Sequence, residues 1–491
     1  MSQTSVSLSS LFPQLSNESL LEDYIGYVLS SLLALLSVFS IFFPLSALFK
    51  FCKSSKTTPS RHTTTNNNTN NSNEDEQKQS ETHDTISYHS HVGFTSVVRS
   101  FLIRSVLSGV IFFVALPWAF DTFSNQIYSF ETFLKNANAK TIHENIPFIA
   151  DLHADTLMWK YRGGFLTTEK GHVSLPKMQR GNQALQVLAA VNFIPHTLNM
   201  KTNVNSTDIL PFLIASQLYE YSAWFSPFGR ARAYSKLLHQ YESESKGIFT
   251  IIKNKKNLEE FITKRSHNKK HASGLFSIEG ATVLENNLDN IQKLYDMGVR
   301  MFGLNHFGDN QVSGSLHGLT KYGLSDFGRQ VVKKLSDLKV IIDLAHASEK
   351  AMNDVLEMLE RGEISTSIII SHTGVKGVCN TTRNLSDEFA KRIAKHGGVI
   401  GIAFFKYTTC GLGFESVAKS IKYLKNLLGG HSVDNIALGS DWDGTIKAFG
   451  ASDHLVYLTD ALISEGFTEK EISQIMGGNV LRMLRRSLPD Y

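Results

Sequence analysis

The residues best suited to chemistry in this sequence are histidines and carboxylates at the ends of short apolar runs. His153 and Asp155 lie in FIADLHAD, Glu279 lies near the end of GLFSIEGA, and Asp441 lies in the closing DWD of NIALGSDWD. Residues i and i+2 of a strand point to the same face, so His153 and Asp155 can converge on one ion. Equivalent positions in other runs are occupied by three more histidines, His306, His346 and His372.

This set of side chains predicts a metal centre. One His-x-Asp pair or one histidine at a strand end is commonly structural, but six such ends are costly to explain by packing, because buried polar groups without partners are unfavourable. Even without His306, three His, one Glu and two Asp exceed the three protein ligands of an open mononuclear zinc site. We therefore expect two divalent ions with a carboxylate between them. Imidazole and carboxylate ligands suit zinc and also admit manganese or iron.

The elements that must position these residues are short β-branched runs that alternate with helical patterns, which is typical of βα units on a parallel sheet. Eight such runs predict an α/β fold, a (β/α)8 TIM-type barrel with insertions, the longest at 197–273. Parallel barrels place their active sites at the carboxyl ends of the strands, where the histidines and carboxylates lie. The eight runs are 148–155, 183–191, 274–281, 299–306, 340–346, 367–373, 398–405 and 435–443.

Several motifs together resemble one known family. DLHADTL, FSIEGA, LNHFGD, IDLAHAS, ISHTGVKGVCNTTRN, LGSDWDG and MGGNVLRML, in this order between residues 146 and 484, are similar to the membrane (renal) dipeptidase family of zinc metallopeptidases, which are amidohydrolase-like barrels. The resemblance implies a binuclear dipeptidase that cleaves dipeptides with a water bridging two ions, most simply Zn²⁺. It also implies His153 and Asp155 on the first ion, His346 and His372 on the second, and Glu279 bridging both.

Three further roles follow from the resemblance. Asp441 takes a proton from the bridging water and passes it to the leaving amine, His306 stabilises the oxyanion, and Arg383 binds the substrate carboxylate. Amide hydrolysis needs an activated water, a Lewis acid, a proton donor and charge stabilisation, and this set supplies all four. Ser371 precedes His372, but neighbours on a strand face opposite ways, so we expect Ser371 to line the barrel wall. The alternative for Arg383 is a solvated loop arginine.

Two other functions stay open at this point. Barrel and metals are shared across many substrates, so another amidohydrolase, acting for instance on N-acyl amino acids, is the nearest alternative. A catalytically inactive, membrane-tethered binding barrel is the other, and it predicts broken ligands, whereas the ligand set here is intact. The sequence leaves the oligomeric state open, a homodimer included.

Composition excludes several classes of protein. The chain has 491 residues, of which 42% are hydrophobic and 19% charged, so it is neither globally disordered nor collagen-like. A net charge of +4 from 49 basic and 45 acidic residues argues against a nucleic-acid partner. Three cysteines exclude a disulfide-stapled miniprotein.

The N-terminal region predicts attachment to a lipid bilayer. Residues 24–49 are uncharged and long enough to span it, and 105–120 form a shorter uncharged run. Basic residues concentrate between the two runs, so with two spans the positive-inside rule places the catalytic domain in the lumen or outside the cell. The expected organisation is a segment 1–23, a transmembrane helix 24–49, a polar linker 50–98, a second membrane segment 99–120, a connector 121–144 and the metallopeptidase barrel 145–491.

The resemblance also has consequences for the cellular compartment of the catalytic domain. Cys379 and Cys410 match one family disulfide, which is expected to form if the domain is exoplasmic. The chain ends in LRRSLPDY without a hydrophobic tail, so anchoring is expected from the N-terminal span. Two sequons, at Asn380 and Asn384, flank Arg383, where a glycan would lie near the mouth of the site.

Overall fold

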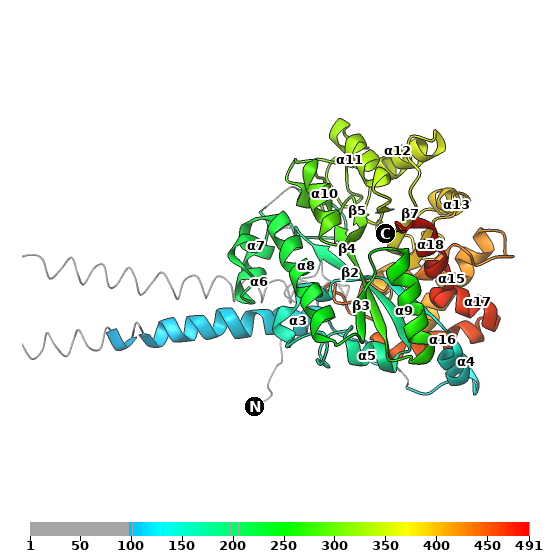
Figure 1. Cartoon of the computed structure of the whole chain (residues 1–491), viewed down its shortest axis with the longest axis horizontal. Helices are drawn as coiled ribbons and strands as arrows, with labels where there is room; N and C mark the ends of the chain where they lie inside the picture. Colours follow the sequence, from blue (N-terminus) through cyan, green and yellow to red (C-terminus); the bar gives the residue numbers. More distant parts are fainter. Residues whose placement is uncertain (1–97, 101, 131, 197, 205–206, 491) are drawn as a thin grey trace, which may run out of the picture. The chain divides into compact units, whose positions relative to one another are not determined.

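The computed structural model describes residues 98–100, 102–130, 132–196, 198–204 and 207–490 (Figure 1). The chain divides after Phe120 into two compact units. The predicted segment 1–23, the transmembrane helix 24–49 and nearly all of the linker 50–98 lie outside the described residues.

An apolar helix, Val98–Ser124, contains the run predicted to be the second membrane segment. Its most apolar window has a mean hydropathy of 1.9 and is 18% buried, so by length and composition it can cross a membrane. Residues Ile111–Ala115 form a π-helical turn, which α3 (Leu116–Ser124) continues. Pro117 lacks the N–H that a regular helix would bond to residue 113, and this explains the irregular turn at that point.

The second unit is the predicted barrel. Eight parallel strands follow the order β2-β1-β9-β8-β7-β6-β5-β4, and pairing of β2 with β4 closes the ring. Each strand overlaps one of the eight predicted runs, so the (β/α)8 prediction is confirmed. The strands are β1 (Ile149–Ala154), β2 (Gln183–Val191), β4 (Ala272–Glu279), β5 (Val299–Gly303), β6 (Ile341–Asp343), β7 (Ile368–Thr373), β8 (Val399–Ile402) and β9 (Ile436–Leu438).

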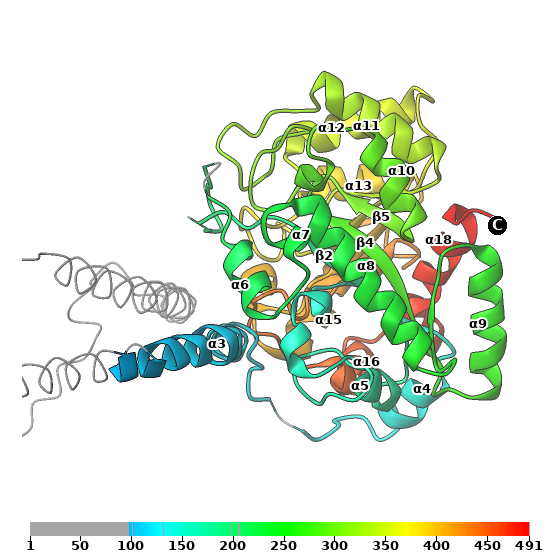
Figure 2. The ribbon, with the colours of Figure 1, turned by 60° about the vertical axis from the view of Figure 1, so that its left-hand side comes forward.

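The core packs from the amino-terminal side of the strands. Parallel strands covered by helices are buried on both faces, and every residue of the eight barrel strands is buried. Figure 2 shows α9 (Lys255–His267) and α18 (Asn479–Ser487) side by side next to the barrel. Their apolar faces join one residue from each of several strands in a single cluster, which includes Leu185, Leu275, Met301, Ile341, Ile369 and Val399. The polar groups lie at the opposite ends of the strands, the carboxyl ends.

The 197–273 insertion contains regular structure. α6 (Leu210–Ser216), α7 (Tyr221–Phe225) and the 18-residue α8 (Pro227–Glu244) lead to β3 (Phe249–Ile251), followed by α9. β3 lies outside the ring and pairs in parallel with the first residues of β4. β3 was not predicted, because a strand of three residues carries too little periodicity to be recognised in a sequence. Ser226 begins α8 by accepting a hydrogen bond from Gly229 N, and Pro227 occupies the first turn, where no N–H is needed.

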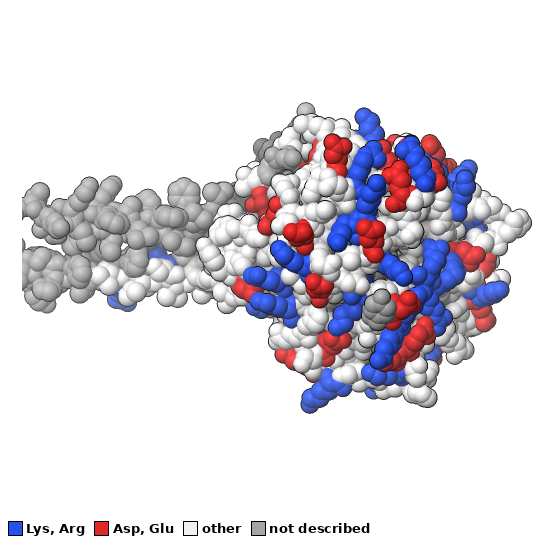
Figure 3. Space-filling view, turned by 45° about the horizontal axis from the view of Figure 1, so that its top comes forward, with Lys and Arg blue, Asp and Glu red and all other residues white. Residues whose placement is uncertain are grey.

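The surface of the barrel carries mixed charge. On the face in Figure 3, Lys and Arg are interspersed with Asp and Glu over the helices. Among the described residues, opposite charges also form ion pairs, such as Arg485 with Glu259 and Arg180 with Glu169.

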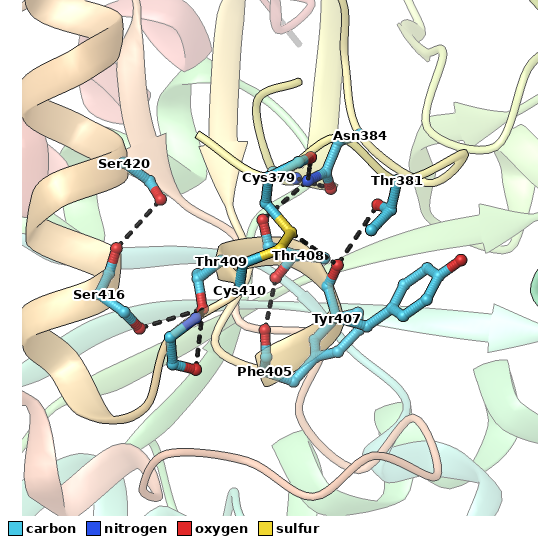
Figure 4. The surroundings of a disulfide bond; sticks show 12 residues. Cys379, Thr381, Asn384, Phe405, Tyr407, Thr408, Thr409, Cys410, Ser416 and Ser420 are labelled. Atoms are coloured by element: carbon cyan, nitrogen blue, oxygen red, sulfur yellow. Dashed lines mark hydrogen bonds between the residues drawn. A yellow bond between two sulfur atoms is a disulfide. The ribbon is translucent and has the colours of Figure 1, made fainter. Parts of the chain in front are cut away.

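The expected disulfide is present. Cys379, in the loop after β7, is bonded to Cys410, directly after α14 (Lys406–Thr409), as Figure 4 shows. Asn384 lies beside it, and its Nδ2 donates to the carbonyl oxygens of Cys379 at 2.6 Å and Thr408 at 2.8 Å. The bond therefore ties the loop that carries Arg383 to the loop after β8.

The two sequons in this loop differ in accessibility, and this gives a prediction about modification. Asn380 is exposed, whereas Asn384 is buried with its amide engaged. A glycan is therefore expected on Asn380 and not on Asn384 when the chain passes through the secretory pathway. Glycopeptide mapping by mass spectrometry checks this, with Asn380→Gln as the control that removes the signal. An unmodified Asn380 in such material would contradict the exoplasmic placement.

Candidate metal centre

Six ionisable side chains from five strands meet at the carboxyl ends of the barrel. His153 and His372 belong to β1 and β7, and Glu279 is the last residue of β4. The other three follow their strands directly: Asp155 follows β1, His346 follows β6 and Asp441 follows β9. All six side chains are largely withdrawn from solvent, with Asp441 the most accessible at 13%.

Glu279 occupies the centre of this group. Its Oε2 lies 3.5 Å from Nε2 of His153, and its Oε1 lies 3.3 Å from Nε2 of His346 and 3.6 Å from Nε2 of His372. Each carboxylate oxygen thus faces a different set of imidazoles. His153 Nε2 is also 3.5 Å from Oδ1 of Asp155. The geometry divides the group into His153 with Asp155 on one side of Glu279, and His346 with His372 on the other.

Unpartnered polar atoms test whether cations fit here. Among the described residues, His153 Nε2, Asp155 Oδ1 and Glu279 Oε2 are buried without a hydrogen-bond partner. Buried polar atoms are almost always partnered, so three orphans within one cluster call for a ligand. Nε2 of His346 and Nε2 of His372 lie 3.0 Å apart, and burial lowers the pKa of both rings. Neutral imidazoles are the form that binds metal, so the donor set fits divalent ions.

Asp441 faces the same space from the far side. Its Oδ1 lies 4.0 Å from Nε2 of both His153 and His372, and burial raises its pKa well above the ordinary aspartate value. Asp441 and His346 both have left-handed backbones, with φ of 66° and 62°. Non-glycine residues rarely hold such angles unless their surroundings enforce them, and they cluster at functional sites. A Cβ on Gly444 would lie 2.6 Å from Asp441 Oδ1 and 2.8 Å from Asp155 Oδ2, so a larger residue there would displace these carboxylates.

The two remaining predicted residues border the cluster. His306 Nε2 lies 3.8 Å from Glu279 Oε1, and its Nδ1 lies 3.1 Å from Phe193 O. Arg383 is only 2% exposed, which excludes the solvated alternative. Its Nη2 donates to His372 O at 2.7 Å and lies 3.4 Å from Nε2 of His346. The structure thus brings all eight predicted site residues to one end of the barrel.

The model of the membrane dipeptidase family, peptidase family M19, matches residues 136–488. The chain belongs to peptidase family M19. The resemblance seen in its strand-end motifs is thereby confirmed. The match covers the whole barrel and begins after the first part of the connector.

Individual relatives of this M19 chain are distant. Dipeptidase 3 of Macaca fascicularis is 28% identical over 225 residues, which are 43% of this chain and 44% of that protein, so the chain matches under half the length of this curated relative. The probable dipeptidase PvdM of Pseudomonas aeruginosa aligns over 72% of this chain and 98% of its own, with 21% identity and a TM-score of 0.58. A Rhodobacter sphaeroides metallo peptidase, liganded with a phosphinate mimic of L-Ala-D-Ala, aligns over 69% and 99%, with 21% identity and a TM-score of 0.55. These solved structures share the fold.

One part of this M19 site differs from expectation. Ser371 was expected to face the barrel wall, but its Oγ lies 2.7 Å from Nδ1 of His372 and 2.5 Å from Oδ2 of Asp343. The pairing of β7 with β8 shifts register between Ile370 and Thr373, so strict alternation fails there. The Ser371 hydroxyl donates to Asp343 and accepts from Nδ1–H of His372. This chain of bonds leaves the Nε2 lone pair of His372 free to bind metal.

A second buried carboxylate supports β1 and was also missed. Asp151 accepts hydrogen bonds from Gln186 Nε2 at 2.7 Å and from Ser440 N at 2.7 Å. Ser440 directly precedes Asp441, so Asp151 ties the strand of His153 to the start of the Asp441 turn. The spacing in the sequence could have indicated Asp151, because residues i and i+2 of a strand, here Asp151 and His153, lie on the same face.

Proposed function

We propose that the chain is a membrane-anchored dipeptidase that uses two divalent ions, zinc being the best match to the ligands. The observation that carries the proposal is the position of Glu279, whose two oxygens face separate imidazole groups. Glu279 would therefore contribute to both ligand sets if two ions bind. His153 and Asp155 complete the first ligand set, and His346 and His372 complete the second. Metal analysis of the purified chain, with dipeptide hydrolysis before and after chelation, tests it.

The other side chains then act on a dipeptide. Two divalent ions, when bound, lower the pKa of a shared water and polarise a carbonyl oxygen. Asp441, beside both ligand sets, accepts a proton and delivers it to the leaving amine, a role suited to a carboxyl whose pKa burial has raised. His306 donates a hydrogen bond to the oxygen on which charge develops. Arg383 binds the terminal carboxylate.

Substrate choice rests on Arg383 and gives a second prediction. A planar guanidinium binds a carboxylate through two parallel hydrogen bonds, and losing a desolvated charged pair costs roughly 2–5 kcal/mol. A dipeptide is therefore expected to be hydrolysed far better than its C-terminal amide. Arg383→Met is expected to remove most of that preference by raising KM more than it lowers kcat. The measurement is kcat/KM for one dipeptide and its amide.

Arg392→Met is the matched control for this prediction. Arg392 lies on α13 (Asp387–Lys395) and pairs with Glu360, outside the metal cluster. Its loss is expected to leave the preference unchanged. Equal wild-type efficiency on acid and amide would rule out recognition of a free carboxylate.

The nearest alternative is an amidohydrolase acting on N-acyl amino acids, because these also carry a free carboxylate. The two substrates differ in the acyl group on the carbonyl side of the scissile bond, which carries a free amino group only in the dipeptide. A panel of dipeptides against N-acetyl amino acids of matched side chain separates them. Higher kcat/KM for the acetylated series would replace the dipeptidase proposal with the deacylase.

Membrane anchoring and orientation complete the proposal and give a third prediction. The helix Val98–Ser124 supports anchoring, and the basic residues that precede it support a catalytic domain on the exoplasmic side. Protease added to sealed microsomes is expected to cleave within 50–98 and to spare the unit Asp121–Tyr491. Digestion of that unit without detergent would reverse the orientation.

A further inference from the structure

The turn that carries Asp441 has an unusual backbone. Asp441, Asp443 and Thr445 all adopt left-handed conformations, with φ of 66°, 62° and 59°. L-amino acids disfavour this region. Three such conformations within five residues are therefore maintained only where contacts with the surroundings hold the backbone in place. Residues 441–448, called the Asp441 loop below, therefore depend on contacts from other parts of the chain.

Asp443 anchors the middle of the Asp441 loop. Its carboxylate is fully buried and accepts from Thr156 Oγ1 at 2.7 Å and from His172 N at 2.8 Å, and Oδ1 lies 2.9 Å from Nη1 of Arg162. Its carbonyl oxygen accepts from Trp159 Nε1 at 2.8 Å. Arg162 neutralises the buried charge and so holds the pKa of Asp443 below the usual aspartate value, against the effect of burial.

Arg162 in turn is held by a residue from the far N-terminal side of the barrel unit. Its Nε donates to Oδ2 of Asp121 at 2.9 Å and its Nη2 to Oδ1 at 2.5 Å, a bidentate pair. Tyr161 OH donates to the same carboxylate. Asp121 is 6% exposed, so the chain Asp121–Arg162–Asp443 runs through the interior. The stability of such a buried network depends on every member, because removal of one leaves the charge of another buried without a partner.

The residues after Asp121 bind the rest of the Asp441 loop. Asn125 Oδ1 accepts from Thr445 N at 2.9 Å. Ala448 N donates to Gln126 O at 2.8 Å, and Tyr128 N donates to Ala448 O at 2.9 Å, which makes a short β-bridge. Residues 121–128, called the entry segment below, thus contact the loop directly at Thr445 and at its last residue, Ala448.

His172 joins the entry segment to the loop a second time. Asp443 N donates to its Nδ1 at 3.0 Å, so Nδ1 carries no proton. The proton lies on Nε2, which is 3.2 Å from Gln126 O. Burial lowers the pKa of His172, which keeps the ring in this neutral form. A neutral imidazole with one tautomer acts as a fixed spacer between the two segments.

We propose that the entry segment 121–128 is a positioning element for Asp441, acting through Arg162 and Asp443. The segment precedes residues 136–488, which the family model matches. It also continues the apolar helix that ends at Ser124. The residue that moves protons is thereby held by the part of the barrel unit that adjoins the candidate membrane segment. The inference rests on the proposed role of Asp441.

The test compares two buried carboxylates that hold different parts of the connector. In full-length protein, Asp121→Ala is expected to lower kcat ten- to hundredfold, the usual range for a group that orients a site from behind, with KM within threefold. KM is spared because Arg383 lies on the separate loop after β7. The control is Asp460→Ala: Asp460 is 5% exposed and accepts from the amide nitrogens of Lys135 and Asn136, both at 2.8 Å. It is expected to change kcat less than twofold.

A second measurement does not depend on catalysis. Hydrogen–deuterium exchange of peptides covering 441–448 is expected to rise at least tenfold in Asp121→Ala and to stay unchanged in Asp460→Ala. Asn125→Ala, which removes the side-chain bonds to Thr445 N and to Asp121 Oδ1 but keeps the Asp121 carboxylate, serves if Asp121→Ala fails to fold. It is expected to raise exchange three- to tenfold around Thr445.

The outcomes separate this inference from the proposed function. Equal losses of kcat in Asp121→Ala and Asp460→Ala, or unchanged exchange at 441–448 in both Asp121→Ala and Asn125→Ala, would overturn the positioning role. A wild-type chain that hydrolyses no dipeptide would overturn the proposed function alone, while exchange still decides whether the entry segment fixes the loop.

Discussion

Replacement of Glu279 by glutamine is expected to lower metal content and turnover together. The amide keeps the size of the carboxylate but presents one neutral oxygen and one N–H, so it cannot serve two cations from two sides. The amide NH₂ would replace one of the two oxygens. It would then lie 3.5 Å from His153 Nε2 in one orientation of the amide, or 3.3 Å from His346 Nε2 in the other. Loss of a Lewis acid worth several kcal/mol corresponds to about 10³-fold or more in kcat.

Elemental analysis and kcat for the same preparation check this prediction. At least one ion per chain is expected to be lost in Glu279→Gln. Glu471→Gln is the control, because Glu471 pairs with Lys425 on the helical exterior and its loss leaves the cluster intact. Glu279→Gln with full metal content and normal turnover would contradict the bridging role.

Much of the fold was readable from the sequence for a physical reason. Parallel strands buried on both faces must be continuously apolar, so runs such as 183–191 and 367–373 stand out from the amphipathic helices between them. The barrel rule then places whatever follows each run at one rim. His306, His346 and His372 were therefore recognisable as neighbours although they are far apart along the chain.

Supporting contacts were not readable in the same way. The bonds of Ser371 to His372 and Asp343 depend on a local register shift in β7, which no alternation pattern encodes. The pair of Arg162 with Asp443 joins residues about 280 positions apart, and nothing in either neighbourhood specifies the other. Sequence periodicity reports which face is apolar, whereas buried polar networks are specified only by the tertiary fold.

The insertion illustrates a second limit. Its longest helix, α8, mixes charged, aromatic and small residues, and it buries Arg230. Arg230 is held there by Asp208 and by main-chain oxygens of Asn192 and Ala223. From the hydrophobic pattern of the sequence alone, an arginine is predicted to be exposed. Its burial becomes favourable only through partners that the tertiary fold supplies.

Asp441→Asn is expected to separate proton transfer from metal binding. The asparagine keeps the side-chain volume beside Gly444, so the left-handed turn can persist, but it cannot accept and return a proton at neutral pH. General acid–base groups contribute about 10²–10⁴-fold, so a loss of that size in kcat is expected with KM little changed. Both ions are expected to remain, because Asp441 lies 4.0 Å from the nearest imidazole nitrogens, farther than the ligands lie from one another.

Asp155→Asn is the contrast that makes this result decisive. Asp155 and Asp441 are both buried carboxylates that face His153, at 3.5 Å and 4.0 Å from its Nε2. If Asp155 binds metal and Asp441 moves protons, Asp155→Asn loses an ion and regains activity at raised metal concentration, whereas Asp441→Asn does neither. Rescue of Asp441→Asn by added metal would make Asp441 a ligand instead, and near-normal kcat in that variant would leave the proton to another group. The two variants thus assign the roles of neighbouring carboxylates that the static geometry brings within reach of the same histidine.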